Sequence, residues 1–254
     1  MTDYIISVSN LSFSYDKKKT FISNLSLDID RGSINAIFGP NGCGKTTLIK
    51  CLLKFFKSEG SIVINGKEIS KISFKEIASL VSYVPQFIDI PMNFSVRDYI
   101  VLGLAPNIKF YQSPSDELYK KVDEIAKKLN IEKIVNKTIN SLSGGEMQMV
   151  SIARALAQHT DIIVLDEPMA SLDFGNQGRL LRLLRKLNQE GKTIIFTTHN
   201  PNHISFLKCN VFFMKNGSLL ESTNNLSKEM IKNLYDEEVT IFCNDELETY
   251  FWKQ

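Results

Sequence analysis

The 254-residue sequence predicts an α/β fold in which a mainly parallel sheet carries helices on its faces and a helical segment is inserted between strands. Short apolar strands alternate with apolar-periodic helices through most of the chain, a pattern typical of parallel sheets. Between about Ser95 and Val135 the β-branched runs stop and helical periodicity replaces them, interrupted by Pro106 and Pro114. The sequence has no internal repeat and no low-complexity linker, so one domain is expected over residues 1–254.

The expected elements can be placed in order along the chain. Apolar alternation and short apolar runs predict strands at 11–15, 25–29, 34–38, 61–64, 81–84, 161–165, 193–197, 211–214 and 218–220. Helical periodicity predicts helices at about 45–56, 146–158 and 175–190. After residue 220 the sequence is rich in Lys and Glu and predicts a peripheral helix.

Composition narrows the class of protein. Hydrophobic residues make up 43% and charged residues 23%, as in ordinary globular proteins, and a net charge of +2 provides no general attraction for nucleic acid. No apolar stretch approaches the ~20 residues needed to cross a bilayer, and the N-terminus lacks the apolar core of a signal peptide. We therefore expect a cytosolic protein, or one attached to a membrane through partners. The four cysteines form no C-x-x-C pair and are expected to be free thiols: Cys43, Cys51, Cys209 and Cys243.

A glycine-rich loop follows the strand at 34–38 and precedes the helix at about 45–56. Residues 39–46 match the pattern G-x-x-x-x-G-K-[ST] throughout. Glycines allow successive backbone N–H groups to surround phosphate oxygens, and the start of the helix adds partial positive charge. Lys45 is expected to contact the β- and γ-phosphates of a nucleotide, and the Thr46 hydroxyl to bind Mg²⁺. The expected phosphate-binding residues are Gly39, Asn41, Gly42, Cys43, Gly44, Lys45, Thr46 and Thr47.

Two consecutive acids follow the apolar strand at 161–165. Asp166 and Glu167 lie at the carboxyl end of that strand, which in a parallel sheet faces the phosphate-binding loop. Asp166 is expected to hold Mg²⁺, and Glu167 to act as the general base that polarises an attacking water. The alternative interpretation is an exposed acidic strand end with no chemical role.

A second candidate anion site lies at the start of the helix at 146–158. Ser143, Gly144, Gly145 and Glu146 combine a hydroxyl, two glycines and an acid at a helix N-terminus. Ser143 and Glu146 also fit a capping box, which leaves the two glycines unexplained. Because the chain already has one phosphate loop, a second anion site makes sense if it serves the ATP held by a partner subunit.

These motifs, in this order, resemble the nucleotide-binding subunit of an ABC transporter, and the resemblance covers nearly the whole chain. It implies an ATP-binding cassette of the P-loop NTPase class, with an antiparallel β sub-domain and an inserted helical sub-domain. It also implies a head-to-tail homodimer in the ATP-bound state, with two ATP molecules sandwiched between the loop of one copy and residues 143–146 of the other. Further residues that match the family are Tyr15 for adenine stacking, Gln86 for sensing Mg²⁺ and water, Asp173 at the dimer seam and His199 for contact with the γ-phosphate.

The resemblance implies a layout and partners as well. The core with its β sub-domain is expected at about 1–94 and 160–222, the helical sub-domain at about 95–159, and a C-terminal extension at about 223–254. The expected partners are transmembrane permease subunits and, indirectly, an extracytoplasmic solute-binding protein, which would place the chain peripherally on the cytoplasmic face of the cell membrane. The apolar segment after Gln86 is expected to dock on the permease: Phe87, Ile88, Ile90, Met92 and Phe94.

Other classes fit the sequence less well. Soluble ABC ATPases usually carry two cassettes or a long coiled-coil insertion, whereas this chain has one cassette and a short helical insert. A P-loop GTPase would need Asn-Lys-x-Asp, and the Asn-Lys pair at 136–137 lacks the acid. A half-exporter would need fused membrane spans. His159 and His203 lack the position of His199 at the end of an apolar strand and are expected to be structural.

The transported solute is inferred from a sub-family resemblance alone. Segments 96–103, 172–177 and 198–203 are similar to importers of iron chelates, haem, cobalamin or oxyanions such as molybdate. We therefore expect uptake of a metal chelate of the iron-siderophore, haem or cobalamin class, with ferric siderophore as the leading candidate. The alternatives are an importer of molybdate, zinc, manganese or amino acids, and, less favoured, a soluble ABC ATPase without a transport role.

Overall fold

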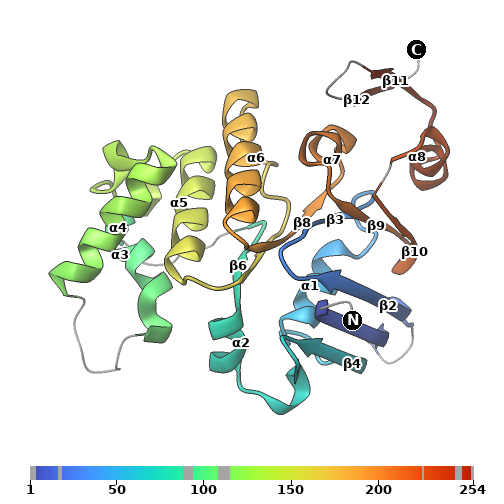
Figure 1. The fold of residues 1–254 in the computed structure, drawn as a ribbon, viewed down its shortest axis with the longest axis horizontal. Coiled ribbons are helices and arrows are strands. Elements are labelled where there is room, and N and C mark those ends of the chain that lie inside the picture. Colours follow the sequence, from blue (N-terminus) through green and yellow to red (C-terminus); the bar gives the residue numbers. More distant parts are fainter. Residues whose placement is uncertain are drawn as a thin grey trace.

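A computed structural model describes residues 4–16, 19–87, 94–107, 115–224, 226–243 and 248–252. At its centre lies a six-stranded sheet with the strand order β10-β9-β3-β8-β7-β6 (Figure 1). These strands are β3 (Ile34–Phe38), β6 (Val81–Val84), β7 (Ile162–Leu165), β8 (Thr193–Thr198), β9 (Asn210–Lys215) and β10 (Ser218–Thr223). All neighbours pair in parallel except β9 and β10, which form an antiparallel hairpin at one edge. The predicted mainly parallel core sheet is thereby confirmed.

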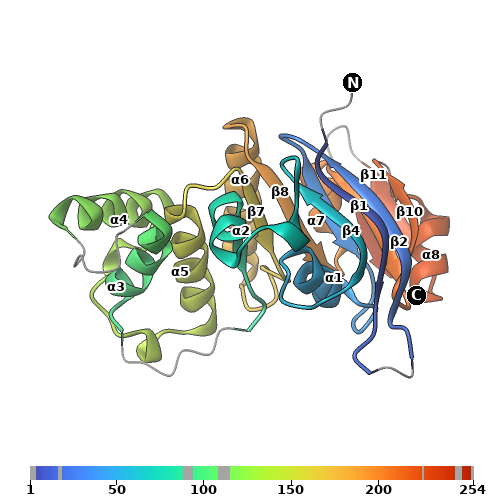
Figure 2. The same ribbon diagram turned by 90° about the horizontal axis from the view of Figure 1, so that it is seen from below.

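A second sheet has four antiparallel strands in the order β2-β1-β4-β5. They are β1 (Tyr4–Phe13), β2 (Ile22–Asp30), β4 (Glu59–Ile64) and β5 (Lys67–Glu68). Apolar residues on one face of these strands share a core with α1 (Lys45–Leu52), whose Leu48 and Ile49 are fully buried. Residues of the central sheet, including Ile37 of β3, belong to the same core, so α1 is packed between the two sheets (Figure 2). This packing fixes the start of α1 relative to the end of β3.

Helices surround the remainder of the central sheet. They are α2 (Phe74–Leu80), α3 (Val96–Val101), α4 (Asp116–Leu129), α5 (Gly144–Ala157), α6 (Phe174–Gln189) and α7 (Pro201–Leu207), with short 3₁₀ helices at Ile69–Lys71, Leu102–Asn107, Glu132–Ile134 and Ile139–Ser141. Helices α3, α4 and α5 lie together at the end of the molecule away from β1 and β2 (Figures 1 and 2). One apolar core joins Val122 of α4, Ile152 of α5 and Leu180 of α6. No helix within the described ranges is both long and apolar enough to cross a membrane.

The C-terminal segment contains α8 (Lys228–Tyr235) and the hairpin of β11 (Val239–Cys243) and β12 (Glu248–Trp252). The Tyr250 N–H donates to Asn202 Oδ1 at 2.8 Å, which ties β12 to α7. The Tyr235 hydroxyl at the end of α8 donates to the carbonyl oxygen of His199 at 3.0 Å. The segment therefore contacts the chain directly after β8.

The structure differs from the sequence prediction at several element ends. The strand expected to include Tyr15 ends at Phe13, and the helix expected to reach residue 56 ends at Leu52. The helix stops because Lys54 adopts a left-handed conformation with φ 63°, and its ammonium donates to the Ile72 carbonyl at 2.7 Å. Among the short helices and strands, α2, α7, β5, β11 and β12 were not predicted from the sequence.

Candidate active site

The carboxyl ends of neighbouring parallel strands place the predicted site residues at one edge of the central sheet. The last residue of β3, Phe38, pairs with Thr198 of β8, and β8 pairs in turn with β7. The Asp166 N–H, directly after β7, donates to the Val84 carbonyl of β6 at 2.9 Å. The loops that follow β3, β6, β7 and β8 therefore start side by side, where parallel sheets bind their ligands.

The loop between β3 and α1 needs glycine at two positions. A Cβ on Gly39 would lie 2.2 Å from the Met214 carbonyl oxygen of β9, a distance that no side chain tolerates. Gly44 has φ 113°, and a Cβ there would lie 2.8 Å from Met214 Cε. The Gly217 N–H also donates to the Cys43 carbonyl at 2.8 Å. The phosphate loop is thus packed tightly against the hairpin of β9 and β10, with its backbone in a conformation that few residues adopt.

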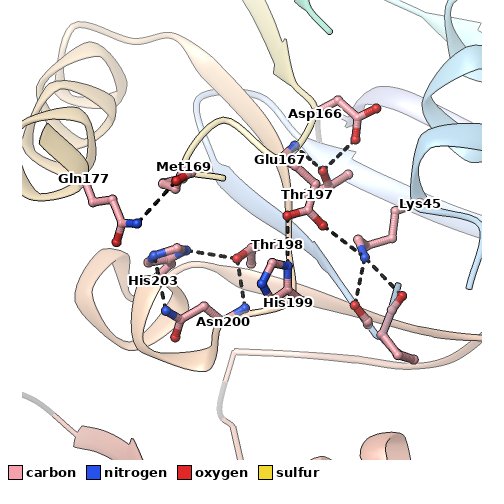
Figure 3. A network of polar contacts seen from close by, with 12 residues as sticks. Lys45, Asp166, Glu167, Met169, Gln177, Thr197, Thr198, His199, Asn200 and His203 are labelled. Carbon is pink, nitrogen blue, oxygen red and sulfur yellow. Dashed lines mark hydrogen bonds and ion pairs between the residues drawn. The ribbon is translucent and has the colours of Figure 1, made fainter. Parts of the chain in front are cut away.

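Lys45 begins α1 and reaches back into the loop (Figure 3). Its Nζ donates to the carbonyl oxygens of Gly39 at 2.8 Å and Pro40 at 3.1 Å. The same Nζ lies 3.2 Å from Glu167 Oε1, and the two side chains are only 6% and 8% exposed. A buried charge requires opposite charge or hydrogen bonds close by, and these contacts supply both to Lys45. Residues 41–42, at the loop's tip, are exposed.

Glu167 lies between Lys45 of the phosphate loop and His199, the residue predicted to contact the γ-phosphate. Its Oε2 lies 3.0 Å from His199 Nδ1, whereas its other carboxylate oxygen, Oε1, contacts Lys45 (Figure 3). The backbone of Glu167 has φ 47°, which is uncommon for a residue other than glycine. Its N–H donates to Thr197 Oγ1 at 2.6 Å. The structure therefore brings together three residues that come from three separate motifs of the sequence.

Asp166 is fully buried, and its two oxygens are in different surroundings. The Thr197 hydroxyl donates to Oδ1 at 2.7 Å, whereas Oδ2 is buried without a hydrogen-bond partner among the described residues. Burial raises the pKa of Asp166, an effect that Thr197 and the nearby Thr46 hydroxyl partly offset. Mg²⁺ takes oxygen ligands such as carboxylates, and a buried carboxylate oxygen beside a threonine hydroxyl fits that preference. Asp166 and Thr46 thus form a chemically suitable donor set for the predicted metal.

Tyr15 lies beside the start of α1, although it follows the end of β1. Its hydroxyl forms a 2.6 Å hydrogen bond with Thr47 Oγ1. The ring meets Phe13 and Phe21 edge-on at centroid distances of 4.9 and 5.2 Å, yet 62% of the residue is exposed. The structure therefore places an accessible aromatic ring next to the phosphate loop, as a residue that stacks on a base requires.

The second predicted anion site, residues 143–146, lies apart from this cluster. Helix α6 lies between α5 and α1 in Figure 1, and Figure 2 likewise shows α5 and α1 well separated. The Glu146 N–H donates to the Ser143 hydroxyl at 3.3 Å, and Glu146 Oε2 accepts from the Ser143 N–H at 2.8 Å, so the capping box is present. No hydrogen bond or ion pair within the described ranges connects these residues with Lys45 or Asp166.

The two glycines of this site face the loop before α6. A Cβ on Gly144 would lie 3.6 Å from the Ser171 side chain, and one on Gly145 would lie 3.5 Å from the Ser171 carbonyl. Asp173 caps α6 by accepting from the Asn176 N–H at 2.8 Å. Residues 143–146 and 171–173 therefore form one continuous surface. The start of α5 on this surface is separated in space from α1 and the phosphate loop.

Three other residues of the sequence analysis have clear positions. Gln86 follows β6 at the same sheet edge as Asp166 and is half-buried, while residues 88–93 of the predicted docking segment lie outside the described ranges. Cys43 is buried, and burial raises its pKa, which disfavours the reactive thiolate. His203 is buried against the Thr198 hydroxyl at 3.0 Å, and burial lowers its pKa to about 4. This burial and the bond to Thr198 favour the structural role expected of His203, which stays a prediction.

The sequence analysis missed residues that shape the site without belonging to its motifs. Thr197 contacts both acids, Met214 packs on the phosphate loop, and Tyr235 contacts the His199 backbone. Thr197 offered one signal, because it is a hydroxyl residue that directly follows the apolar run of residues 194–196. Met214 and Tyr235 offered none, since their contacts depend on chain pairing far away in sequence.

The sequence is similar to known proteins over most of its length. The sequence profile of the family described as ABC transporter matches residues 22–170. A probable iron chelatin transport ATP-binding protein of Helicobacter pylori strain J99 is 32% identical, covering 97% of this chain and 99% of that protein. The molybdate import ATP-binding protein MolC of Haemophilus influenzae is 33% identical, with coverage of 91% and 87%.

Solved structures agree with the sequence relatives. An inward-facing ABC transporter described as metal-chelate type aligns with a TM-score of 0.84 at 29% identity, covering 99% of this chain and 98% of that chain. A dimeric ATP-binding cassette in a post-hydrolysis state, bound to ADP and Pi, aligns with a TM-score of 0.78 at 28% identity, covering 86% and 97%. The chain therefore belongs to the ABC transporter family, as an ATP-binding and ATP-hydrolysing subunit.

Proposed function

We propose that this ATPase energises uptake of a metal chelate of the iron-siderophore, haem or cobalamin class through partner permease subunits. The observation that carries the proposal is the full-length similarity to an iron chelatin transport protein, at 32% identity. The second candidate is an importer of another solute such as molybdate, zinc or manganese, and the similarity to a molybdate importer supports molybdate among these. In either case the chain would lie peripherally on the cytoplasmic face of the membrane, with an extracytoplasmic solute-binding protein as an indirect partner.

The chemistry rests on the cluster at the sheet edge. Lys45 would bind the β- and γ-phosphates, since its ammonium already lies inside the loop. Glu167 would orient and deprotonate the attacking water, and His199, which contacts it at 3.0 Å, would bind the γ-phosphate. Tyr15 would stack on the adenine. Contacts within the protein hold each of these residues in place, which lowers the cost of ordering the site.

Thr46, Gln86 and Asp166 would hold Mg²⁺. The ion, when bound, neutralises charge on the phosphate oxygens. Asp166 is suited to this role because its Oδ2 is buried without a partner among the described residues. Gln86 follows β6, the strand that pairs with β7. It would couple the binding of the metal to the surface that faces the permease.

The full site would need a second copy of the chain. Residues 143–146 present a helix N-terminus with two glycines at the start of α5, which lies apart from α1 in Figure 1, and Asp173 precedes α6 next to them. A head-to-tail dimer would place this surface over the ATP of the partner and complete two identical sites. Residues 95–159 would act as a helical sub-domain that presents the surface, beside a core with its β sub-domain at 1–94 and 160–222. Residues at about 223–254 would be a C-terminal extension.

Phe174, next to Asp173, should contribute to this dimer. It is 93% exposed at the start of α6, which is unusual for an aromatic residue unless a partner covers it. The Phe174→Ser variant is expected to weaken ATP-dependent dimerisation by roughly 10-fold, as for an aromatic interface residue. Sedimentation with ATP measures the change, and Phe242→Ser, at a site 63% exposed on β11, is the matched control. Equal dimerisation of both variants would rule out this contact.

A patch of aromatic residues beside Gln86 is the proposed docking surface for the permease. Phe55 and Phe74 are 53% and 57% exposed and stack at a centroid distance of 6.4 Å. The ring centroids of Phe55 and Tyr83 are 5.9 Å apart, and Tyr83 precedes Gln86 by three residues. Phe87, directly after Gln86, is 83% exposed. Exposed apolar side chains gathered in one place are typical of partner sites.

Serine at both Phe55 and Phe74 should release the chain from permease-containing membranes. Loss of two exposed aromatic contacts is expected to lower retention roughly 10-fold or more, while the ATPase rate of the isolated chain stays unchanged. Co-sedimentation with the membranes measures retention. Phe251→Ser, at an exposed position on β12, serves as the control. Full retention of the double variant would place docking elsewhere.

Uptake of labelled solutes tests the cargo. Cells that carry Glu167→Gln in place of the native chain should fail to take up ferric siderophore, haem or cobalamin, whichever the system imports, and a strain with Glu190→Gln should import normally. Normal uptake of all three chelates, together with loss of molybdate, zinc or manganese uptake, would favour the second candidate. If every solute entered normally although Glu167→Gln abolished turnover of the purified chain, the transport role itself would be wrong.

A further inference from the structure

Thr197 lies in β8 between the neighbouring strands β3 and β7, with its side chain at the base of the active site. It is 0% exposed. Its neighbours Ile194, Ile195 and Phe196 in the same strand are apolar and equally buried. Valine has nearly the shape of threonine, so packing alone gives no reason for a hydroxyl at this position.

The hydroxyl makes two contacts, and their direction is fixed by chemistry. The Glu167 backbone N–H can only donate, so Thr197 Oγ1 accepts from it at 2.6 Å. The single hydroxyl hydrogen is then directed to Asp166 Oδ1, at 2.7 Å. One hydroxyl thus links the carboxylate of the first acid to the backbone of the second (Figure 3).

Both acids depend on this link for their position. The Glu167 backbone has φ 47°, so its left-handed conformation needs support from its surroundings, and the bond to Thr197 provides it. The conformation aims the Glu167 side chain between Lys45 and His199. For Asp166, the bond fixes Oδ1 and leaves Oδ2 as the buried oxygen without a partner among the described residues. Rotation of the Asp166 carboxylate would instead place Oδ2 against Thr197 and leave Oδ1 as the oxygen without a partner among the described residues.

We infer that Thr197 is a positioning residue that sets the orientation of both acids for hydrolysis, with Asp166 Oδ2 presented to the metal and Glu167 to the water. The inference rests on the proposed roles of Asp166 and Glu167. In this role Thr197 acts on the two acids through its hydroxyl alone. Removal of such an outer partner commonly lowers activity or metal affinity by roughly 10- to 100-fold.

The central variant is Thr197→Val, which keeps the shape and removes the hydroxyl. Its kcat for ATP hydrolysis should fall roughly 10- to 100-fold, while KM for ATP changes by less than about threefold, because phosphate binding by the loop is untouched. Mn²⁺ titration in the presence of ADP, followed by electron paramagnetic resonance, should show weaker binding and requires no turnover. Thr197→Ser should retain native values on all these measurements.

Thr193→Val is the matched control. Thr193 lies in the same strand, is also 0% exposed, and its hydroxyl accepts from the Gly32 N–H at 2.8 Å at the end away from the site. This variant should lose stability to a similar degree and keep its kcat per folded molecule. If Thr197→Val does not fold, the pair Thr197→Ala and Thr197→Ser decides, since both lack the methyl group and differ only in the hydroxyl.

The outcomes separate the inference from the function on which it rests. If Thr197→Val hydrolyses ATP and binds Mn²⁺ like the native chain, or if the alanine and serine variants are equally active, the positioning role is wrong. In that case Glu167→Gln, assayed in parallel, shows whether Glu167 itself is required. Normal turnover of Glu167→Gln would remove the proposed general base, whatever Thr197 does.

Discussion

Glu167→Gln should bind ATP with native affinity and hydrolyse it roughly 100- to 10,000-fold more slowly, the range associated with loss of a general base. Glutamine keeps the size of the side chain but cannot accept a proton from water. Its amide can still contact His199, which lies 3.0 Å from Oε2 in the native chain. Because binding persists without hydrolysis, the dimer should accumulate in ATP. Single-turnover kinetics measure the loss of hydrolysis, and size-exclusion chromatography in ATP measures the accumulation of the dimer.

The control for this variant is Glu190→Gln, which makes the same chemical change at an exposed ion pair with Lys128. It should leave turnover and dimerisation unchanged. Near-native turnover of Glu167→Gln would show that another group activates the water. Loss of ATP binding in Glu167→Gln would instead indicate that the buried contact with Lys45 is needed to form the loop.

Lys45→Ala should act at the earlier step and weaken ATP binding itself. Two phosphates lose a charge-assisted partner worth about 1.5–3 kcal/mol, so the dissociation constant should rise roughly 10- to 100-fold. Hydrolysis should fall as well, because the same cation no longer stabilises the charge on the transferred phosphate. Fluorescence titration with a labelled nucleotide measures the affinity.

Lys50→Ala provides the matched control on α1. Lys50 lies on the same helix and carries the same charge, and its ammonium is 5.4 Å from the centre of the Phe56 ring rather than in the loop. Its removal should leave nucleotide affinity unchanged. If the two variants bound ATP equally well, the assignment of the phosphate loop would be wrong.

The parts of the fold set by local chemistry could be predicted from the sequence. The loop at 39–46 is a local feature, because glycine conformation and the start of a helix are decided by neighbouring residues. The acid pair was predicted for a similar reason, since it follows an unbroken apolar strand. Helix α2 also carried a local signal, the capping box of Ser73 and Glu76. The helix was still not predicted, because seven residues are too few to show a clear apolar periodicity.

Other features depend on pairing between distant segments. The register of β7 and β8 sets Leu165 opposite Phe196, so the next residues, Asp166 and Thr197, come together only once the sheet has formed. The left-handed conformation of Glu167 is likewise stabilised from β8. The hairpin of β11 and β12 is fixed by α7, through Asn202. None of these contacts leaves a periodic pattern in the sequence.

The separation of residues 143–146 from Lys45 underlies the central claim that each ATP is hydrolysed between two copies of the chain. Two inactive variants test it when they are mixed. Lys45→Ala disables the phosphate loop. Gly145→Asp adds a negative charge to the second anion site at a position where a Cβ has ordinary contacts of 3.5 and 3.6 Å, so the fold should tolerate it.

The decisive measurement is the ATPase rate of these two variants alone and in an equal mixture. In a mixed dimer the intact loop of one copy faces the intact anion site of the other, so one complete site forms although each variant is inactive. The account predicts recovery toward about a quarter of the native rate, because half of the dimers are mixed and each has one of two sites complete. A mixture that shows no more activity than the separate variants, with both folded and forming mixed dimers, would contradict a site shared between two copies.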